Sequence, residues 1–338
     1  MLSILENFSL KNLNTFGVEA KARWYVEIQS ESDLQSLFSD AKWFEIDRLI
    51  IGGGSNILFT QDFHGLVIRN SIKGIKHEIN GIEVLLKSGA GEVWDDLVNY
   101  AVDHNFSGIE NLSLIPGSVG ASPIQNIGAY GVEIKDIFYE CRAFEIETRE
   151  IKIFNLNECA FGYRDSIFKT NYKGKFIITE VSYNLSTIQN RNTSYDAINE
   201  ELTRRKISSP SVRDISQVVS HIRIAKLPDP SFIGNAGSFF KNPIVRREKF
   251  DFLKLDFVDI VGFTIDEIDV KLAAGWLIEQ CGWKGTIFGN TGTWKNQALV
   301  LINHGNATGM EIFEFSHIII ESVKSKFGII LEREVNII

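Results

Sequence analysis

The chain has 338 residues, 44% of them hydrophobic and 23% charged, which excludes a disordered protein and allows two or three domains with substantial cores. Its formal net charge of −8 excludes the basic surface that nucleic acid binding requires, so we expect no nucleic acid partner. Residues 1–7 lack the basic head and apolar core of a signal peptide, and no segment approaches the roughly 18 apolar residues of a membrane span. We therefore expect a cytoplasmic protein that has no membrane partner.

Cysteine and histidine usage gives no sign of a metal centre. The three cysteines, Cys141, Cys159 and Cys281, are odd in number and lack C-x-x-C spacing, which argues against a disulfide framework and a zinc site. We interpret them as small core residues. The six histidines show no ligand pairing at helical spacing, so we expect no bound metal.

The first half of the chain reads as strands with one clear helix. Short apolar runs alternate with turn residues, which is typical of strands, several of them in short βα units. These runs lie at 22–28, 49–51, 66–68, 84–87 and 176–183. A helix is predicted where apolar residues recur at a spacing of three and four, namely at Trp94, Leu97, Val98, Ala101 and Val102.

A second domain is predicted after a polar stretch at 184–194, which we interpret as a linker or mobile loop. Ser211 is placed to cap a helix that ends before 227–230, and its apolar face comprises Ile215, Val218, Val219 and Ile222. A helix over 271–281, terminated by Gly282, and a strand at 298–302 follow. Thr308 and Glu311 form a capping box that opens a last helix through about Val323. This mixture predicts the α+β class.

The first glycine-rich motif, Gly52, Gly53, Gly54, Ser55 and Asn56, follows an apolar strand directly. Three successive glycines leave a turn without Cβ atoms, so that backbone N–H groups can face an anion such as a pyrophosphate. The motif is neither G-x-G-x-x-G nor a P-loop. A tight turn from strand to helix explains it equally well.

The second glycine-rich segment covers 114–131. Its two prolines and four glycines exclude a regular element, yet the apolar residues between them indicate partial burial. Buried irregular backbone needs hydrogen-bonding partners, which a large polar cofactor can supply. A well-ordered structural loop is the alternative.

The two segments, with 14–18 upstream and 89–94 between them, resemble the UDP-N-acetylenolpyruvoylglucosamine reductase family, in the variety that carries a tyrosine loop. The likeness continues through motifs at 162–166, 226–230, 235–243, 297–301 and 331–335. It implies an FAD-binding domain of the vanillyl-alcohol-oxidase type with lobes at 1–72 and 73–187, a linker with a mobile tyrosine loop at 188–210, and an α+β substrate-binding domain at 211–338. It also implies a monomer that uses FAD and NADPH to reduce a UDP-amino sugar for peptidoglycan synthesis, a pathway that serves cell shape and division.

The resemblance also implies which residues bind the cofactor and the substrate. The FAD-binding residues are Gly52, Gly53, Gly54, Ser55, Asn56, Pro116, Gly117, Ser118, Gly120, Asn126, Gly128 and Tyr130. The residues that hold the UDP-sugar are Tyr195, Lys226, Asn242 and Gln297. Lysine suits a diphosphate as a point charge, and a tyrosine can close over a nucleotide with an apolar ring and a polar tip.

Reduction of an enolpyruvyl group makes two demands that matching residues can meet. Hydride delivery to its terminal carbon drives negative charge toward the carboxylate, which a cation must stabilise, and a general acid must then supply a proton. By resemblance, Arg164 meets the charge, Ser238 donates the proton with Lys241 as one contributor nearby, and Glu334 polarises the substrate carboxyl group or handles its proton. Without the resemblance, these are ordinary residues: an arginine paired with Asp165, a turn-capping serine and a solvent-facing glutamate.

Two residues depart from the family pattern, and two alternative functions stay open. Asn336 stands where the family usually has arginine, and Trp294 where histidine is expected, which affects flavin or pyrophosphate contacts near the C-terminus. The same scaffold also suits an FAD oxidase of a sugar or hydroxy acid, because a fold alone does not fix a function. A silent nucleotide-sugar sensor is the alternative outside enzymes, and intact Arg164, Ser238 and Glu334 argue against it.

Overall fold

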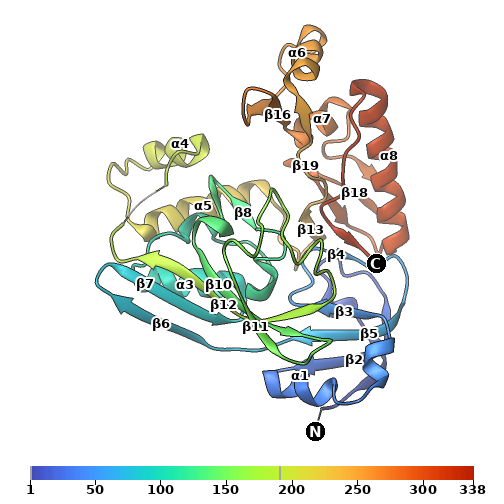
Figure 1. Ribbon diagram of the computed structural model, residues 1–338. Coiled ribbons are helices and arrows are strands. Elements are labelled where there is room, and N and C mark those ends of the chain that lie inside the picture. The colour runs from blue at the N-terminus through green and yellow to red at the C-terminus, as the bar shows by residue number, and fades with distance from the viewer. Residues whose placement is uncertain (1, 190–191) are drawn as a thin grey trace. The chain divides into compact units, whose positions relative to one another are not determined.

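The structure, a computed structural model, describes residues 2–189 and 192–338, so part of the predicted linker, at 190 and 191, lies outside the described residues. Helices and strands are mixed along the chain, which confirms the α+β class (Figure 1). The chain forms two compact units. Unit 1 contains 2–8, 22–53 and the described part of 63–223, and unit 2 contains 9–21, 54–62 and 224–338.

Unit 1 begins with a four-stranded sheet whose last three strands run parallel. In spatial order the strands are β1 (Leu5–Ser9), β2 (Lys21–Ile28), β5 (Phe63–Asn70) and β3 (Arg48–Ile51). Strands that run parallel need a crossover connection. The connection from β2 to β3 contains α1 (Glu31–Leu37) and α2 (Lys42–Glu45). Val26, Leu34 and Ile68 are fully buried between these elements.

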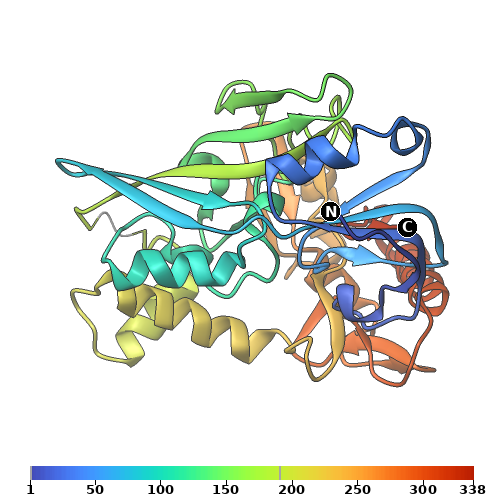
Figure 2. The ribbon, with the colours of Figure 1, turned by 90° about the horizontal axis from the view of Figure 1, so that it is seen from below.

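The second sheet of unit 1 is antiparallel and has five strands. In spatial order they are β11 (Ile151–Asn155), β10 (Phe138–Glu145), β12 (Phe176–Ser186), β7 (Glu83–Gly89) and β6 (Ile75–Asn80). The predicted apolar face of α3 (Trp94–Asp103) is buried in one core with residues of β7 and β12. Figure 2 shows α3 between this sheet and α5 (Val212–Lys226).

Short elements lie between α3 and β10, in and beside the second glycine-rich segment. They are η2 (Glu110–Leu112), η3 (Val119–Ala121), β8 (Gly128–Ala129), β9 (Val132–Glu133) and η4 (Ile134–Asp136). The segment is therefore mostly irregular, as its proline and glycine content predicts.

The helix predicted after Ser211 is confirmed as α5, but most of it belongs to unit 1. Ser211 Oγ accepts a hydrogen bond from Asp214 N, and the Asp214 carboxylate accepts one from Ser211 N in return. The predicted apolar face of α5 packs against Ile198 and Leu202 of α4 (Asp196–Arg204). In the chain, unit 1 ends at Arg223 and the last stretch of unit 2 begins at Ile224.

Unit 2 is built on an antiparallel sheet next to α8 (Gly309–Phe327). The order is β13 (Gly234–Ser238), β19 (Gln297–Asn303), β18 (Thr291–Trp294) and β17 (Ile287–Phe288). The other elements are η1 (Lys11–Leu13), β4 (Ile57–Leu58) paired with β20 (Asn336–Ile337), β14 (Ile244–Arg246), α6 (Arg247–Asp256), β15 (Gly262–Thr264), β16 (Asp269–Leu272) and α7 (Ala274–Gln280). Figure 1 shows α6 and β16 at one end of this unit.

Two predicted boundaries are wrong. The helix expected over 271–281 begins only at Ala274, because 269–272 form strand β16, which pairs with both β14 and β15. The polar stretch expected to begin at Asn184 contains the end of β12, since Asn184, Leu185 and Ser186 continue the ladder with β7. The other predicted strands and helices are confirmed, including α8 and its capping box.

Two further observations concern membranes and cysteines. None of the helices in the described part of the chain is both long and apolar enough to span a bilayer. Cys141 and Cys159 are buried as predicted, whereas Cys281 is only half-buried. Contact with Cys159 and burial raise the pKa of the Cys141 thiol, which keeps it protonated and inert.

We expect Thr308→Ala to lower the free energy of unfolding by about 1 kcal/mol, the usual cost of losing a helix N-cap. Thr308 Oγ1 accepts a hydrogen bond of 3.2 Å from Glu311 N, and alanine removes this acceptor. Urea unfolding measures the change. Thr203→Ala, at an exposed position near the end of α4, is the control and should leave stability unchanged. Equal unfolding midpoints for the two variants would contradict the capping role.

Candidate functional site

The two glycine-rich segments meet in unit 1. A Cβ on Gly53 would lie 3.1 Å from Gly117 Cα, and one on Gly52 would overlap the Ser118 side chain. The same segment contacts the motif at 89–94, because a Cβ on Gly120 would lie 2.6 Å from the Ala90 Cβ. The glycines are therefore required for the close packing of these segments, which leaves no room for a Cβ. The alternative of a turn from strand to helix is wrong, since β4 follows the first motif.

The remaining glycine of the first motif and its neighbours lie in unit 2. Gly54 packs against Leu13, whose carbonyl group a Cβ would overlap. Asn56 Nδ2 donates to Glu334 O at 3.3 Å, and Asn56 O accepts from both N–H and Nδ2 of Asn336 at 3.1 and 2.9 Å. Asn336, which replaces the expected arginine, therefore binds the backbone of the first glycine-rich motif.

Arg164 lies beside the second glycine-rich segment. Its Nη2 donates a hydrogen bond of 2.8 Å to Gly128 O, and Lys169 Nζ donates one of 3.0 Å to Arg164 O. The Asp165 carboxylate accepts from Ser166 N–H. Arg164 has a φ of +54°, which is uncommon for a residue other than glycine and indicates local constraint. The Arg164 guanidinium is thus held against the second glycine-rich segment.

Asn126, a predicted cofactor ligand, serves as a buried support in this structure. Its Nδ2 donates to Gly162 O at 3.0 Å and to Glu133 Oε2 at 3.2 Å, and its Oδ1 accepts from Lys135 N at 3.0 Å. The amide thus connects the second glycine-rich segment to the motif that carries Arg164.

Tyr130 and the predicted substrate residue Tyr195 contact each other. Their ring centroids lie 5.2 Å apart in an edge-to-face arrangement. Burial raises the pKa of Tyr130, and the nearby Arg223 guanidinium opposes this shift. Arg223 Nε donates to Leu114 O at 3.2 Å. Sequence reasoning missed Arg223 because the helical pattern of α5 shows it only as a polar position.

Ser238 and Glu334 lie on neighbouring stretches of unit 2. Glu334 N donates a hydrogen bond of 2.8 Å to Phe239 O, and Phe240 forms a bridge with Arg333. Ser238 is exposed at the end of β13, and Glu334 is half-buried. The two predicted catalytic groups of this unit are therefore brought together by the backbone.

Lys241, the suggested contributor near Ser238, is paired with a carboxylate. Its ammonium group forms an ion pair of 2.5 Å with Glu332 Oε1, and the lysine side chain is only 17% exposed.

Two of the predicted substrate residues of unit 2, Asn242 and Gln297, lie near the start of α7. Asn242 Oδ1 accepts a hydrogen bond of 3.0 Å from Ala274 N, and a Cβ on Gly275 would lie 2.7 Å from Gln297 Oε1. Lys226 is tied to the same region through its neighbour, because Ala225 O accepts a hydrogen bond of 2.8 Å from Asn296 Nδ2. Trp294, the second departure from the family pattern, pairs with Gln297 across β18 and β19.

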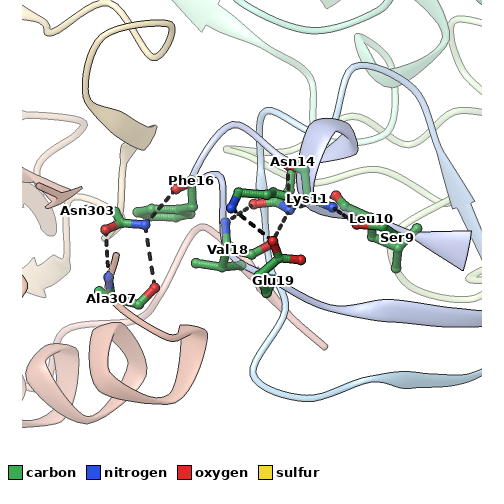
Figure 3. Close-up of polar contacts among 9 residues, drawn as sticks. All are labelled: Ser9, Leu10, Lys11, Asn14, Phe16, Val18, Glu19, Asn303 and Ala307. Atoms are coloured by element: carbon green, nitrogen blue, oxygen red, sulfur yellow. Dashed lines mark hydrogen bonds and ion pairs between the residues drawn. The ribbon is translucent and has the colours of Figure 1, made fainter. Parts of the chain in front are cut away.

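The motif at 14–18 is bound to strands β13 and β19, and Figure 3 shows its contact with Asn303 of β19. Asn14 Nδ2 donates to Leu10 O and Val18 O at 2.8 and 3.1 Å, which closes a compact loop. Asn303 Nδ2 donates to Phe16 O at 3.0 Å, and Asn235 N of β13 donates to Thr15 O at 3.0 Å. Gly234 permits this approach, since a Cβ there would overlap Phe16 O.

Among the described residues, no group of three or more histidine, cysteine, aspartate or glutamate side chains is arranged to hold a metal ion.

Gly53→Val is expected to yield folded protein that lacks bound flavin, because the new side chain fills the narrow contact with Gly117. Visible absorbance of the purified protein measures the bound flavin. Gly81→Ala is the control: its φ of +62° also strains an alanine, but the added Cβ meets no atom within 4 Å. Stoichiometric flavin in Gly53→Val would contradict the cofactor assignment.

Comparison with known proteins agrees with this geometry. The family model described as an FAD binding domain matches residues 22–151. The model described as the C-terminal domain of UDP-N-acetylenolpyruvoylglucosamine reductase matches 229–338. A solved structure of that reductase from Thermus caldophilus has the same fold, with a TM-score of 0.66 at 21% identity over 100% of this chain and 98% of the other. These matches confirm the predicted FAD-binding fold followed by a second domain.

Full-length relatives establish the family. The UDP-N-acetylenolpyruvoylglucosamine reductase of Flavobacterium johnsoniae is 49% identical over the whole of both chains. The proteins of the same name from Amoebophilus asiaticus and Pseudomonas syringae pv. syringae are 46% and 43% identical, over 100% and 99% of each chain. The chain therefore belongs to the UDP-N-acetylenolpyruvoylglucosamine reductase family.

Proposed function

We propose that this chain catalyses the NADPH-dependent, FAD-mediated reduction of UDP-N-acetylglucosamine enolpyruvate to UDP-N-acetylmuramate. The observation that carries the proposal is the backbone pairing of the Ser238 and Glu334 segments in a chain whose relatives bear this reductase's name along their full length. We assign FAD to the lobes at 1–72 and 73–187 and the UDP-sugar to 211–338, with the tyrosine loop at 188–210 contributing Tyr195. The crowded contact between Gly53 and Gly117 supports a cofactor held largely by backbone.

Arg164 is assigned to the charge that develops on the substrate. The chemistry that bound FAD supplies is the transfer of a hydride from NADPH to the terminal carbon of the enolpyruvyl group. Negative charge then moves toward the substrate carboxylate, and we assign the Arg164 guanidinium to stabilise it. Loss of one such donor costs roughly 3 to 4 kcal/mol in other enzymes. The bond from Arg164 Nη2 to Gly128 O supports this role, because it fixes the side chain beside a proposed cofactor segment.

Ser238 is assigned to the proton that the neighbouring carbon receives. Its hydroxyl is exposed at the end of β13, where a substrate can reach it. Because Lys241 is engaged by Glu332, we assign Glu334 on the adjacent stretch, and not Lys241, as the second group that handles this proton or the substrate carboxyl group. Positioned acids and bases of this kind contribute about 10² to 10⁴ in rate.

The remaining residues hold the UDP-sugar. Lys226 supplies a positive charge for the diphosphate, and the amides of Asn242 and Gln297 provide directed hydrogen bonds near the start of α7. Tyr195 closes over the nucleotide and excludes water. NADPH and the UDP-sugar use the same site in turn, which gives ping-pong kinetics.

The finer proposals concern where and how the enzyme works. We propose a cytoplasmic monomer whose partners are the two small molecules, NADPH and the UDP-sugar. Its product is a precursor of peptidoglycan, so the reaction serves cell wall growth, cell shape and cell division.

Stopped-flow absorbance tests the proposed function directly. NADPH should bleach the flavin, and addition of UDP-N-acetylglucosamine enolpyruvate without oxygen should restore its colour. Recovery that requires oxygen and is indifferent to this sugar would instead favour an oxidase. A protein that NADPH and the sugar leave unchanged would favour a sensor.

Ser238→Ala should separate the two half-reactions. Flavin reduction by NADPH should stay near the wild-type rate, whereas reoxidation by the enolpyruvyl sugar should slow by about 10² to 10⁴ because the proton donor is lost. Both rates come from the stopped-flow experiment. Ser325→Ala, on an exposed face of α8, is the control. Equal slowing of both half-reactions in Ser238→Ala would refute the assignment.

A further inference from the structure

One buried amide joins two loops of unit 1. Asn111, in η2, is only 2% exposed. Its Nδ2 donates a hydrogen bond of 2.9 Å to Tyr130 O and another of 2.9 Å to Asn192 O. A single side chain therefore connects the second glycine-rich segment to the segment that leads into Tyr195.

Asn192 adds a second connection between the same loops. Its Nδ2 donates to Gly131 O at 3.0 Å, while its Oδ1 accepts from Ser194 N at 3.1 Å and from Ser194 Oγ at 2.7 Å. The oxygen of this amide thus shapes the turn before Tyr195, and its nitrogen ties the turn to Gly131. Gly131 has a φ of +81°, so the partner loop presents its carbonyl from a conformation that favours glycine.

These bonds determine where the Tyr195 ring lies. Tyr195 immediately precedes α4, and Ile198 and Leu202 pack α4 against α5. The backbone on the C-terminal side of Tyr195 is therefore fixed. On the other side, Asn192 is bound to Gly131 and Asn111. The tyrosine ring then rests edge-to-face against Tyr130, 5.2 Å between centroids.

We infer that Asn111 and Asn192 form a latch that holds residues 192–195 against the second glycine-rich segment and sets the rate at which the UDP-sugar product leaves. Both are positioning residues, and the inference rests on the proposed role of Tyr195 as a cover for the nucleotide. Asn111 is buried, so breaking its bonds leaves polar groups without partners. Asn192 is half-buried and water can replace its bond to Gly131, so the latch opens at Asn192.

Asn192→Asp removes the hydrogen bond to Gly131 and keeps the hydrogen bonds that shape the turn before Tyr195. A carboxylate keeps both acceptor bonds from Ser194 but cannot donate to Gly131 O. In the full-length protein with FAD bound, we expect UDP-N-acetylmuramate to dissociate up to about tenfold faster, as for the loss of one hydrogen bond. Flavin content, melting temperature and the rate of flavin reduction at saturating NADPH should stay unchanged. Asn111→Ala, which removes both donor bonds of the buried amide, should accelerate dissociation further.

Asn155→Asp is the matched control. Asn155 Oδ1 also accepts bonds from the N–H groups of a following turn, at Asn157 and Glu158, and the variant makes the same chemical change. Its product dissociation rate should equal that of the wild type. The same rate in Asn192→Asp, alongside weakened binding in Tyr195→Ala, would overturn the latch and leave the proposed role of Tyr195 standing. Wild-type binding in Tyr195→Ala would overturn both.

Discussion

Close contact between chain segments that lack Cβ atoms is the constraint on which both compact units depend. In unit 1, Gly52 and Gly53 lie against Gly117 and Ser118, which brings together two motifs that are distant in the sequence. In unit 2, Gly234 lies against the Phe16 carbonyl group and so seats β13 beside the N-terminal segment. An alanine in either place would separate the elements that carry the functional groups. The glycines therefore fix positions as much as they provide conformational freedom.

The functional groups divide by the kind of element that carries them. Ser238 and Glu334 stand on paired extended segments, where backbone hydrogen bonds fix their relation. The proposed cofactor contacts come mainly from irregular loops, although Gly128 stands in the short ladder of β8 and β9 and Gly120 N donates to Ala90 O at 2.8 Å. Arg164 and Tyr130 both have positive φ values in such loops, at +54° and +50°, which marks constrained backbone at this site.

The regular elements could be predicted because apolar periodicity specifies them directly. The buried face of α3 and the capping box of α8 follow from residue spacing alone. The helix predicted over 271–281 includes the end of strand β16. The short alternation of apolar residues in β16 continues almost directly into the apolar first turn of α7. The proposed site residues came from family motifs. The pairing of Lys241 with Glu332 and the bonds of Asn111 and Asn192 could not be predicted, since side chains that bind distant groups leave no periodic signal.

The composition of unit 2 from three separate stretches has a consequence for biosynthesis. Residues 9–21 and 54–62 emerge from the ribosome early, but their partners lie in 224–338. Strand β4, for example, pairs with β20. Asn336 of β20 is translated 280 residues after Asn56, whose backbone carbonyl group it binds. Domains generally fold as units during synthesis, and contacts of such long range form slowly. The early stretches of this unit thus wait, without their native neighbours, until the late stretch has been translated.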